Sequence, residues 1–311
     1  MAFGLATLRD GGAALVVDGK AIRLADHDEP RDALALLDDW DAVLPRLERI
    51  AATAAPGEEA TDFAAPYIPR QIFCTGANYR KHVIGLIMGD PSMRTAEHEG
   101  ISDDERRARA EKTMDERANA ALPFCFLKLP SCVVGPNDPV VLPRNVEKPD
   151  WELELGVVIG KRARHVTPED AMDYVAGFVV VNDVTAREHI FRRDGSAIGA
   201  DWLSGKCFPT FLPFGPMIVP KQFVADPYAL NIKLAVNDKV YQDESTADMM
   251  INIQRQVAYL SDRVVLTPGD VICTGSPYGN GSAFGVYLKP GDVMEGTITG
   301  LGTQRNPCVA E

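Results

Sequence analysis

The sequence predicts a β-rich α+β protein that begins with a small N-terminal unit. From about residue 67 onward, short β-branched runs such as QIFCTG, GFVVVND and NIKLAVN recur, and such runs are typical of strands. Helical patterns are few, whereas a doubly wound parallel sheet would need a crossover helix for each pair of strands. The 311 residues are 46% hydrophobic, which is enough to bury a substantial core. We therefore expect mixed sheets with few helices.

Residues 1–66 form the predicted N-terminal unit of strands and helix. In AALVVDGKAIRL, two apolar runs flank Asp18 and Gly19, a dipeptide typical of a tight hairpin turn. Residues 29–55 have helical apolar spacing, and we expect Pro45 to end or kink that helix. The following PGEEATDFAAPYIP carries Pro and Gly and reads as a linker. We place the second domain at residues 67–311.

The segment SDDERRARAEKTMDERANA, residues 102–120, predicts a helix that is charged around nearly its whole circumference. Ser102 and Glu105 have the spacing of a capping box. Two interpretations stay open: a solvated surface excursion, or a lid formed by residues 84–120 over a site. Residues 167–177 and 246–262 also show helical patterns, the first with Thr167 as a candidate N-cap.

The charge balance restricts the classes of partner. The formal net charge is −12, so nucleic acid would be repelled and we expect no nucleic-acid binding. The start of the chain lacks a basic segment followed by a long apolar run, and no stretch approaches the roughly 20 apolar residues of a membrane span. We therefore predict a cytoplasmic protein that does not bind membranes, with its six scattered cysteines reduced.

Two carboxylates interrupt an apolar run at residues 149–160, PDWELELGVVIG. On a strand, Glu152 and Glu154 point to the same face, roughly 6.5 to 7 Å apart. The run continues without alternation as LGVVIG, which favours burial on both faces, and GFVVVND could bring Asp183 to the same place. An exposed acidic face is the alternative. If the three acids are buried together, a hard divalent cation such as Mg²⁺, Mn²⁺ or Ca²⁺ would offset their repulsion.

Longer strings resemble the fumarylacetoacetate hydrolase family over roughly residues 70–308. They are DWELELGVVIGKRARHVTPEDAMDYVAGFVVVNDVTARE, GKCFPTFLPFGP, PGDVICTGSPYGNG and LKPGDVMEGTITGLGTQRNP. The resemblance implies a mixed β-sheet roll or barrel, a homodimer, and a divalent metal held by Glu152, Glu154 and Asp183. No organic cofactor is implied.

The same resemblance suggests roles for individual residues. It implies catalytic roles for Lys206 in GKCF, Arg187 in NDVTARE and His82 in GANYRKH. Candidate substrate-binding residues are Tyr79, Lys128, Gln242 and Thr274. In the smaller family members a glutamate three residues after the histidine completes a water-activating dyad, but that position here is Gly85. The acids that could replace it are Glu97, Glu99, Asp103 and Asp104.

These residues lead to alternative functions. The first is metal-dependent hydrolysis of a carbon–carbon bond in a β-diketo acid or acylpyruvate, with His82 taking a proton from water near neutral pH and Lys206 stabilising an enolate. The second is decarboxylation, isomerisation or hydration of a keto-enol dicarboxylic acid on the same metal site, which the missing acid at residue 85 favours slightly. A metal-binding protein without catalysis is the third.

Overall fold

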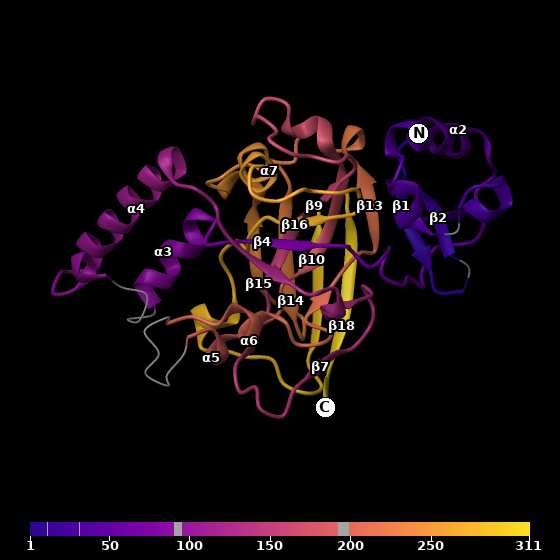
Figure 1. The fold of residues 1–311 in the computed structure, drawn as a ribbon. Helices are drawn as coiled ribbons and strands as arrows, with labels where there is room; N and C mark the ends of the chain where they lie inside the picture. Colours follow the sequence, from indigo (N-terminus) through magenta and orange to yellow (C-terminus); the bar gives the residue numbers. More distant parts are fainter. Residues whose placement is uncertain (11, 31, 90–94, 192–198) are drawn as a thin grey trace.

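The computed structural model describes residues 1–10, 12–30, 32–89, 95–191 and 199–311 (Figure 1). The larger sheet has the spatial order β3 (Lys20–Arg23), β2 (Gly12–Val17), β1 (Gly4–Leu8), β13 (Met217–Pro220), β10 (Val175–Asn182), β9 (Leu153–Ile159), β16 (Val271–Cys273), β4 (Ile72–Gly76) and β5 (Phe124–Lys128). The second sheet has the order β15 (Lys239–Ser245), β14 (Asn231–Val236), β17 (Val293–Ile298), β18 (Gly302–Ala310) and β7 (Val140–Leu142).

The remaining elements are short. Two-stranded pairs are β8 (Pro149–Asp150) with β11 (Thr185–Ala186), and β6 (Val133–Val134) with β12 (Leu212–Pro213). The α-helices are α1 (Ala33–Leu37), α2 (Trp40–Thr53), α3 (Arg80–Gly89), α4 (Asp103–Ala120), α5 (Arg187–Ile190), α6 (Trp202–Lys206) and α7 (Ile253–Ser261). The 3₁₀ helices are η1 (Leu24–His27), η3 (Ala96–His98), η4 (Pro130–Cys132), η5 (Ala171–Tyr174), η6 (Lys221–Phe223), η7 (Thr246–Asp248) and η8 (Gly281–Phe284).

The predicted α+β class with mixed sheets is confirmed. Most neighbouring strands are antiparallel, while β4 with β16 and β7 with β18 are parallel. Both large sheets end in unpaired edge strands, so the described strands do not close into the barrel that the resemblance left as an alternative to a roll. Within the described residues, no helix combines the length and apolar character that a membrane crossing requires.

The central strand β9 is buried on both faces, as the run LGVVIG predicts. Leu153 and Leu155 lie in one core with Ile232 and Leu234 of β14, whereas Val158 belongs to a second core with residues of α1 and α2. Every residue of β9 is buried. Polar side chains on this strand are therefore removed from bulk water, which sets the electrostatics of the site described below.

The N-terminal strands extend the larger sheet. The predicted hairpin turn is confirmed, because Val17 pairs with Lys20 and both Asp18 and Gly19 have positive φ, 50° and 79°. Strand β1 pairs with β13 at Leu5 opposite Ile218, so the first strands share a sheet with the rest of the chain. In Figure 1 they lie at the end of the molecule opposite α3 and α4. The domain boundary at residue 66 stays a prediction.

Three helical predictions need correction. Helix α2 does not end at Pro45, and Trp40, Val43 and Leu47 bury one face of the helix on both sides of the proline. A kink at Pro45, the other predicted outcome, stays a prediction. In residues 167–177 only the 3₁₀ turn η5 forms before β10 begins, although Thr167 Oγ1 does accept a hydrogen bond from the Asp170 N–H. In residues 246–262 the chain forms η7 first, and α7 begins after the Asn252 cap.

Helix α4 is not charged all round. Ser102 caps it as predicted, accepting a hydrogen bond from the Glu105 N–H at 3.3 Å. Its spacing also buries Ala110 and Met114, which pack with Val83 and Ile87 of α3. Helices α3 and α4 therefore form a pair (Figure 1), held by a narrow apolar stripe.

Candidate active site

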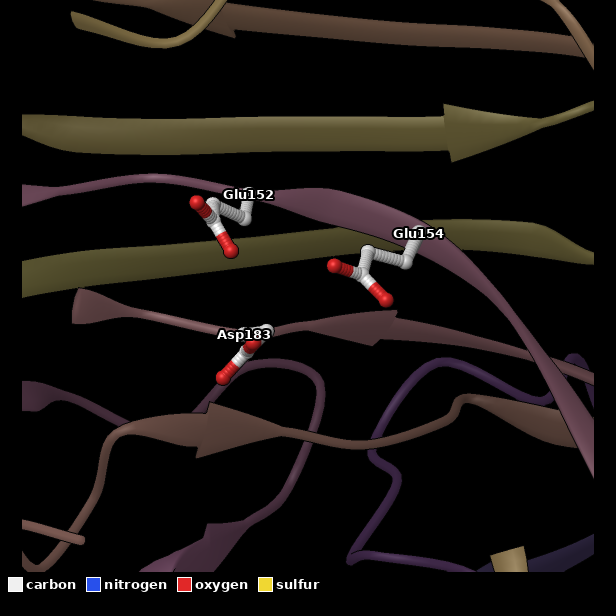
Figure 2. A group of neighbouring side chains, drawn as sticks. All are labelled: Glu152, Glu154 and Asp183. Carbon is white, nitrogen blue, oxygen red and sulfur yellow. The ribbon is translucent and has the colours of Figure 1, made fainter. Parts of the chain in front are cut away.

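The structure brings the three predicted carboxylates together. Strand pairing sets Glu154 opposite Val181, and the Asp183 N–H donates to the Glu152 carbonyl oxygen at 2.8 Å. One ligand oxygen from each acid lies within 4.8 Å of the others, and all three residues are buried (Figure 2). Leu153 lies on the opposite face in the core. The period-2 spacing thus places Glu152 and Glu154 as predicted.

Two buried lysines and one half-buried arginine surround the acids. Lys206, in the last turn of α6, places Nζ 2.6 Å from Glu152 Oε2 and 2.5 Å from Asp183 Oδ2. Lys128 Nζ lies 2.7 Å from Asp183 Oδ1. Arg187 Nη2 lies 2.5 Å from Glu152 Oε1. Burial disfavours the ammonium of Lys206, but Asp183 and Glu152 more than offset this and raise its pKa.

Glu154 is left without a cationic partner among the described residues. Its Oε2 accepts a hydrogen bond from the Gly275 N–H at 2.8 Å. Burial raises the pKa of Glu154 well above its usual value, and Asp183 adds to this shift. For Glu152, by contrast, Arg187 and Lys206 outweigh the cost of burial and lower the pKa.

The charge count fits a divalent cation. With Asp150, which pairs with Arg187, four buried carboxylates face the cations of Lys206, Lys128 and Arg187, so Glu154 would carry an uncompensated negative charge if it were ionised. Converging carboxylate oxygens are the donor set of hard cations, and three such ligands leave coordination positions for water or substrate. Glu152, Glu154 and Asp183 would hold Mg²⁺, Mn²⁺ or Ca²⁺.

His82 lies in the first turns of α3 and lines the same cavity. Burial lowers the pKa of His82 to about 4, with Arg187 and Lys206 acting in the same direction against Glu152. The expectation of a histidine that titrates near neutrality is therefore not met. At pH 7 the imidazole is neutral.

No acid partner for His82 is found among the described residues. The candidates Glu97, Glu99, Asp103 and Asp104 are all exposed and do not line the cavity, and Asp103 instead pairs with Arg106. Position 85 itself has no room for an acidic side chain. A Cβ at Gly85 would lie 2.6 Å from Cε2 of the Tyr278 ring, well inside van der Waals contact. The proposed replacement acids are thus wrong for the chain as described.

The cavity has a volume of about 230 Å³ and two unlike walls. Its charged wall contains the three acids with His82, Lys148, Arg187, Glu188 and Lys206. Its apolar wall contains Leu86, Phe126, Ile190, Phe191 and Trp202. The rings of Phe126 and Trp202 stack with centroids 4.8 Å apart. Such a cavity is smaller than the roughly 300 to 1,000 Å³ of sites for drug-sized ligands, which indicates a small substrate.

Within the predicted lid segment, residues 84–120, only the inner helix α3 lies at the cavity. Leu86 of α3 lines the cavity, whereas no residue of α4 does. Helix α4 packs on the outer side of α3 through Ala110 and Met114. Residues 90–94 of the predicted segment lie outside the described residues.

The four predicted substrate-binding residues lie behind the cavity wall. Tyr79, Lys128, Gln242 and Thr274 are fully buried, and none of them lines the cavity. Gln242 accepts a hydrogen bond from the Leu153 N–H at 3.0 Å, and Thr274 Oγ1 donates to the Leu155 carbonyl at 2.9 Å. The side chains of Gln242 and Thr274 thus hydrogen-bond the backbone of β9 and hold the strand in place. Their predicted contact with substrate therefore stays a prediction, which the cavity lining does not support.

Other residues of the site were not predicted from the sequence. Lys148 and Asp150 flank the acids in the string KPDWELE, where their proximity could have been inferred from the adjoining strand. Ser276, Ser282 and Tyr287 also line the cavity, but they come from a loop that tertiary packing places there. Local sequence patterns do not encode that placement.

Comparisons with known proteins show which family the chain belongs to. A family model described as fumarylacetoacetate (FAA) hydrolase C-terminal matches residues 71–309. A human protein named oxaloacetate tautomerase FAHD2B, mitochondrial, is 36% identical over 285 residues, covering 90% of this chain and 80% of that protein.

Two solved structures share the fold over nearly the whole chain. A probable 2-hydroxyhepta-2,4-diene-1,7-dioate isomerase from Mycobacterium abscessus has 27% identity and a TM-score of 0.77, covering 100% of this chain and 99% of that one. Maleylpyruvate hydrolase from Sphingobium sp. SYK-6, in complex with manganese(II) and pyruvate, has 26% identity and a TM-score of 0.72, covering 99% of each chain. This chain belongs to the fumarylacetoacetate hydrolase family of enzymes.

Proposed function

We propose that this chain catalyses keto–enol tautomerisation of a small dicarboxylic 2-oxo acid of the oxaloacetate class. The observation that carries the proposal is a buried His82 beside the carboxylate triad, with no acid hydrogen-bonded to it among the described residues. Gly85, packed against Tyr278, closes the nearest position from which an acid could act. The human relative named oxaloacetate tautomerase supports the same choice. Proton transfer on carbon needs no activated water, so it does not need an acid–histidine dyad.

The charged wall supplies the groups for binding. Lys148 and Arg187 line the cavity and would bind the carboxylates of the substrate. A divalent cation held by the triad would polarise the 2-oxo group and lower the energy of the enolate. Mn²⁺ in the Sphingobium neighbour supports a hard cation. Which cation this chain uses, including the Mg²⁺ that the sequence suggests, stays part of the proposal.

The residues of the chain would then move one proton. Neutral His82 accepts the proton from C3, leaving an enolate, and the resulting imidazolium returns the proton to the oxygen at C2. The ammonium of Lys206 lies beside this charge and stabilises it while the proton is on His82. No bond between heavy atoms breaks, and no water is consumed.

The tautomerisation is tested by adding enol-oxaloacetate to the Mn²⁺-loaded protein. We expect the ultraviolet absorbance of the enol to fall much faster than in buffer with Mn²⁺ alone, while malate dehydrogenase detects the keto acid in equal amount. Carbon dioxide and pyruvate should not exceed the Mn²⁺ control. A rate equal to that control would contradict the proposal.

Hydrolysis of a carbon–carbon bond is the second candidate. The Sphingobium neighbour is named a maleylpyruvate hydrolase, and the apolar wall of the cavity could accept an acyl chain. Incubation with acylpyruvates in ¹⁸O-water separates the two reactions. Hydrolysis gives two fragments with ¹⁸O in the new carboxylate, whereas tautomerisation leaves the carbon skeleton intact.

We also propose that the chain acts as a homodimer in the cytoplasm. Strand β5 is the edge of the larger sheet and exposes Phe124 and Leu127, with exposed Leu122, Leu129 and Leu203 nearby. An apolar edge of this kind favours contact with a second chain. Light scattering should give twice the mass of one chain. The human relative is named mitochondrial, so localisation by imaging tests the cytoplasmic prediction.

A further inference from the structure

Asp150 is a fully buried carboxylate that the proposed mechanism does not use. Its Oδ1 accepts hydrogen bonds from the N–H groups of Trp151 at 2.8 Å and Gly281 at 2.6 Å. Its Oδ2 accepts from the Ser282 N–H at 3.1 Å and from Arg187 Nε at 2.7 Å. Two carboxylate oxygens offer about four lone-pair sites, so Asp150 is saturated with donors.

Arg187 is held by two acids at once. Besides Nε on Asp150, its Nη2 lies 2.5 Å from Glu152 Oε1. Nη1 has no partner among the described residues, and Arg187 lines the cavity. Because the guanidinium is planar and rigid, the Nε hydrogen bond to Asp150 and the Nη2 ion pair with Glu152, which lacks hydrogen-bond geometry, together set the direction of Nη1. Nη1 is therefore the nitrogen of Arg187 that is available to an anionic group of the substrate.

The hydrogen bonds that Asp150 accepts from the Gly281 and Ser282 N–H groups fix the turn at residues 281–282. This turn begins η8 and supplies Ser282 to the cavity. A Cβ at Gly281 would lie 2.8 Å from Asp150 Oδ1 and 2.1 Å from the Val286 carbonyl oxygen, so glycine permits the close approach. Asp150 therefore joins two walls of the cavity, the one that carries Arg187 and the one that carries Ser282.

We propose that Asp150 is a positioning residue that aims the Arg187 guanidinium at the substrate and fixes the turn at residues 281–282 beside it. Neither the family model nor the relatives assign this role. We call the hydrogen bonds of Asp150 to Arg187 and to the turn at residues 281–282 the clamp. The expected effect on turnover rests on the proposed tautomerisation, whereas the clamp itself does not.

The test combines Asp150→Asn, Arg187→Lys and the double variant. Asparagine has the same shape, but its amide nitrogen donates where two N–H groups need an acceptor. Substituting a partner that orients an active-site group typically costs about 10- to 100-fold. We expect KM for the 2-oxo acid to rise by about that factor in Asp150→Asn, with kcat changing less. Asp10→Asn, in the exposed pair with Arg23, is the matched control and should leave KM unchanged.

The double variant distinguishes positioning from a structural role. If Asp150 acts largely through Arg187, adding Asp150→Asn to Arg187→Lys should raise KM by a clearly smaller factor than adding it to the wild type, and the remainder reflects the turn at residues 281–282. Effects that multiply, or a wild-type KM in Asp150→Asn, would overturn the proposal.

A spectroscopic measurement keeps the proposal testable without turnover. In ¹⁵N-arginine-labelled wild-type protein, the Arg187 Nε–H signal, assigned by its loss in Arg187→Lys, should exchange with water far more slowly than signals of exposed arginines. Exchange at the rate of exposed arginines would overturn the clamp even if Asp150→Asn does not fold. A slow signal with no tautomerase activity would leave the clamp standing and reject the proposed function.

Discussion

The two sides of the cavity are held in place by different forces. On the β9–β10 side, Glu152 and Asp183 lie at the ends of paired strands, joined by a backbone hydrogen bond and by ion pairs with Lys206. On the α3 side, the His82 side chain forms no hydrogen bond or close ion pair within the described residues, and its helix is held by the packing of Val83 and Ile87 on α4. Hydrogen-bonded charges set the position of the proposed metal ligands, while van der Waals contacts set the position of the proposed base. Changes on the two sides should therefore have separable effects.

The largest effect is expected on the sheet side. Glu154→Gln removes one of three anionic ligands, so Mn²⁺ binding should be lost. Cation stabilisation of several kcal/mol would disappear with it, which corresponds to a loss of activity of about a thousandfold. Isothermal titration and the enol assay measure the two effects. Glu295→Gln, at an exposed position of β17, is the control. Mn²⁺ binding of wild-type strength in Glu154→Gln would contradict the ligand assignment.

The next effect is expected on the helix side. His82→Ala should lower kcat by about a hundredfold, in the range for a lost general base, and leave Mn²⁺ affinity within twofold. Exposed His27→Ala should change neither quantity. If His82→Ala lost the metal together with activity, the separation between the two sides would fail.

A smaller effect should follow from moving the helix without touching its histidine. Gly85→Ala places a methyl group against the Tyr278 ring, and overpacking of this kind costs about 1 to 3 kcal/mol of unfolding free energy. We expect a lower melting temperature and an intermediate loss of kcat, both recovered in part by adding Tyr278→Ala. Gly89→Ala is the matched control, because a Cβ there meets nothing within 4 Å on the same helix. Equal behaviour of the two alanine variants would show that the Tyr278 contact does not position α3.

The smallest effect concerns the metal-free protein. Because burial raises the pKa of Glu154 in the folded state, the folded chain keeps a proton that the unfolded chain releases near its ordinary value of 4.5. The wild type therefore loses stability as pH rises from 4.5 through the folded pKa, and Glu154→Gln does not. With chelator present, the melting temperature of Glu154→Gln minus that of the wild type should grow by a few degrees with pH. A difference independent of pH would contradict the raised pKa.

The contrast between the two sides also explains what could be predicted from the sequence. The triad follows from the two-residue spacing of Glu152 and Glu154 and from an adjacent strand that is directly followed by Asp183, which are local patterns. The helix carrying His82 gave no periodic signal that we used, and the contact between Gly85 and Tyr278 joins residues far apart in the chain. Gln242 and Thr274 show the same limit, because polar residues in a loop or strand can serve substrate or backbone, and tertiary packing decides which.

The most direct measurement is anomalous diffraction from crystals soaked in Mn²⁺. The account predicts one anomalous peak between the carboxylates of Glu152, Glu154 and Asp183, with one oxygen of each about 2.0 to 2.3 Å away, as expected for a small divalent cation. Lys206 would then lie beside the ion and still contact Glu152 and Asp183. Carboxylates bridged by Lys206 alone, with no peak at saturating Mn²⁺, would contradict the metal site and the chemistry proposed on it.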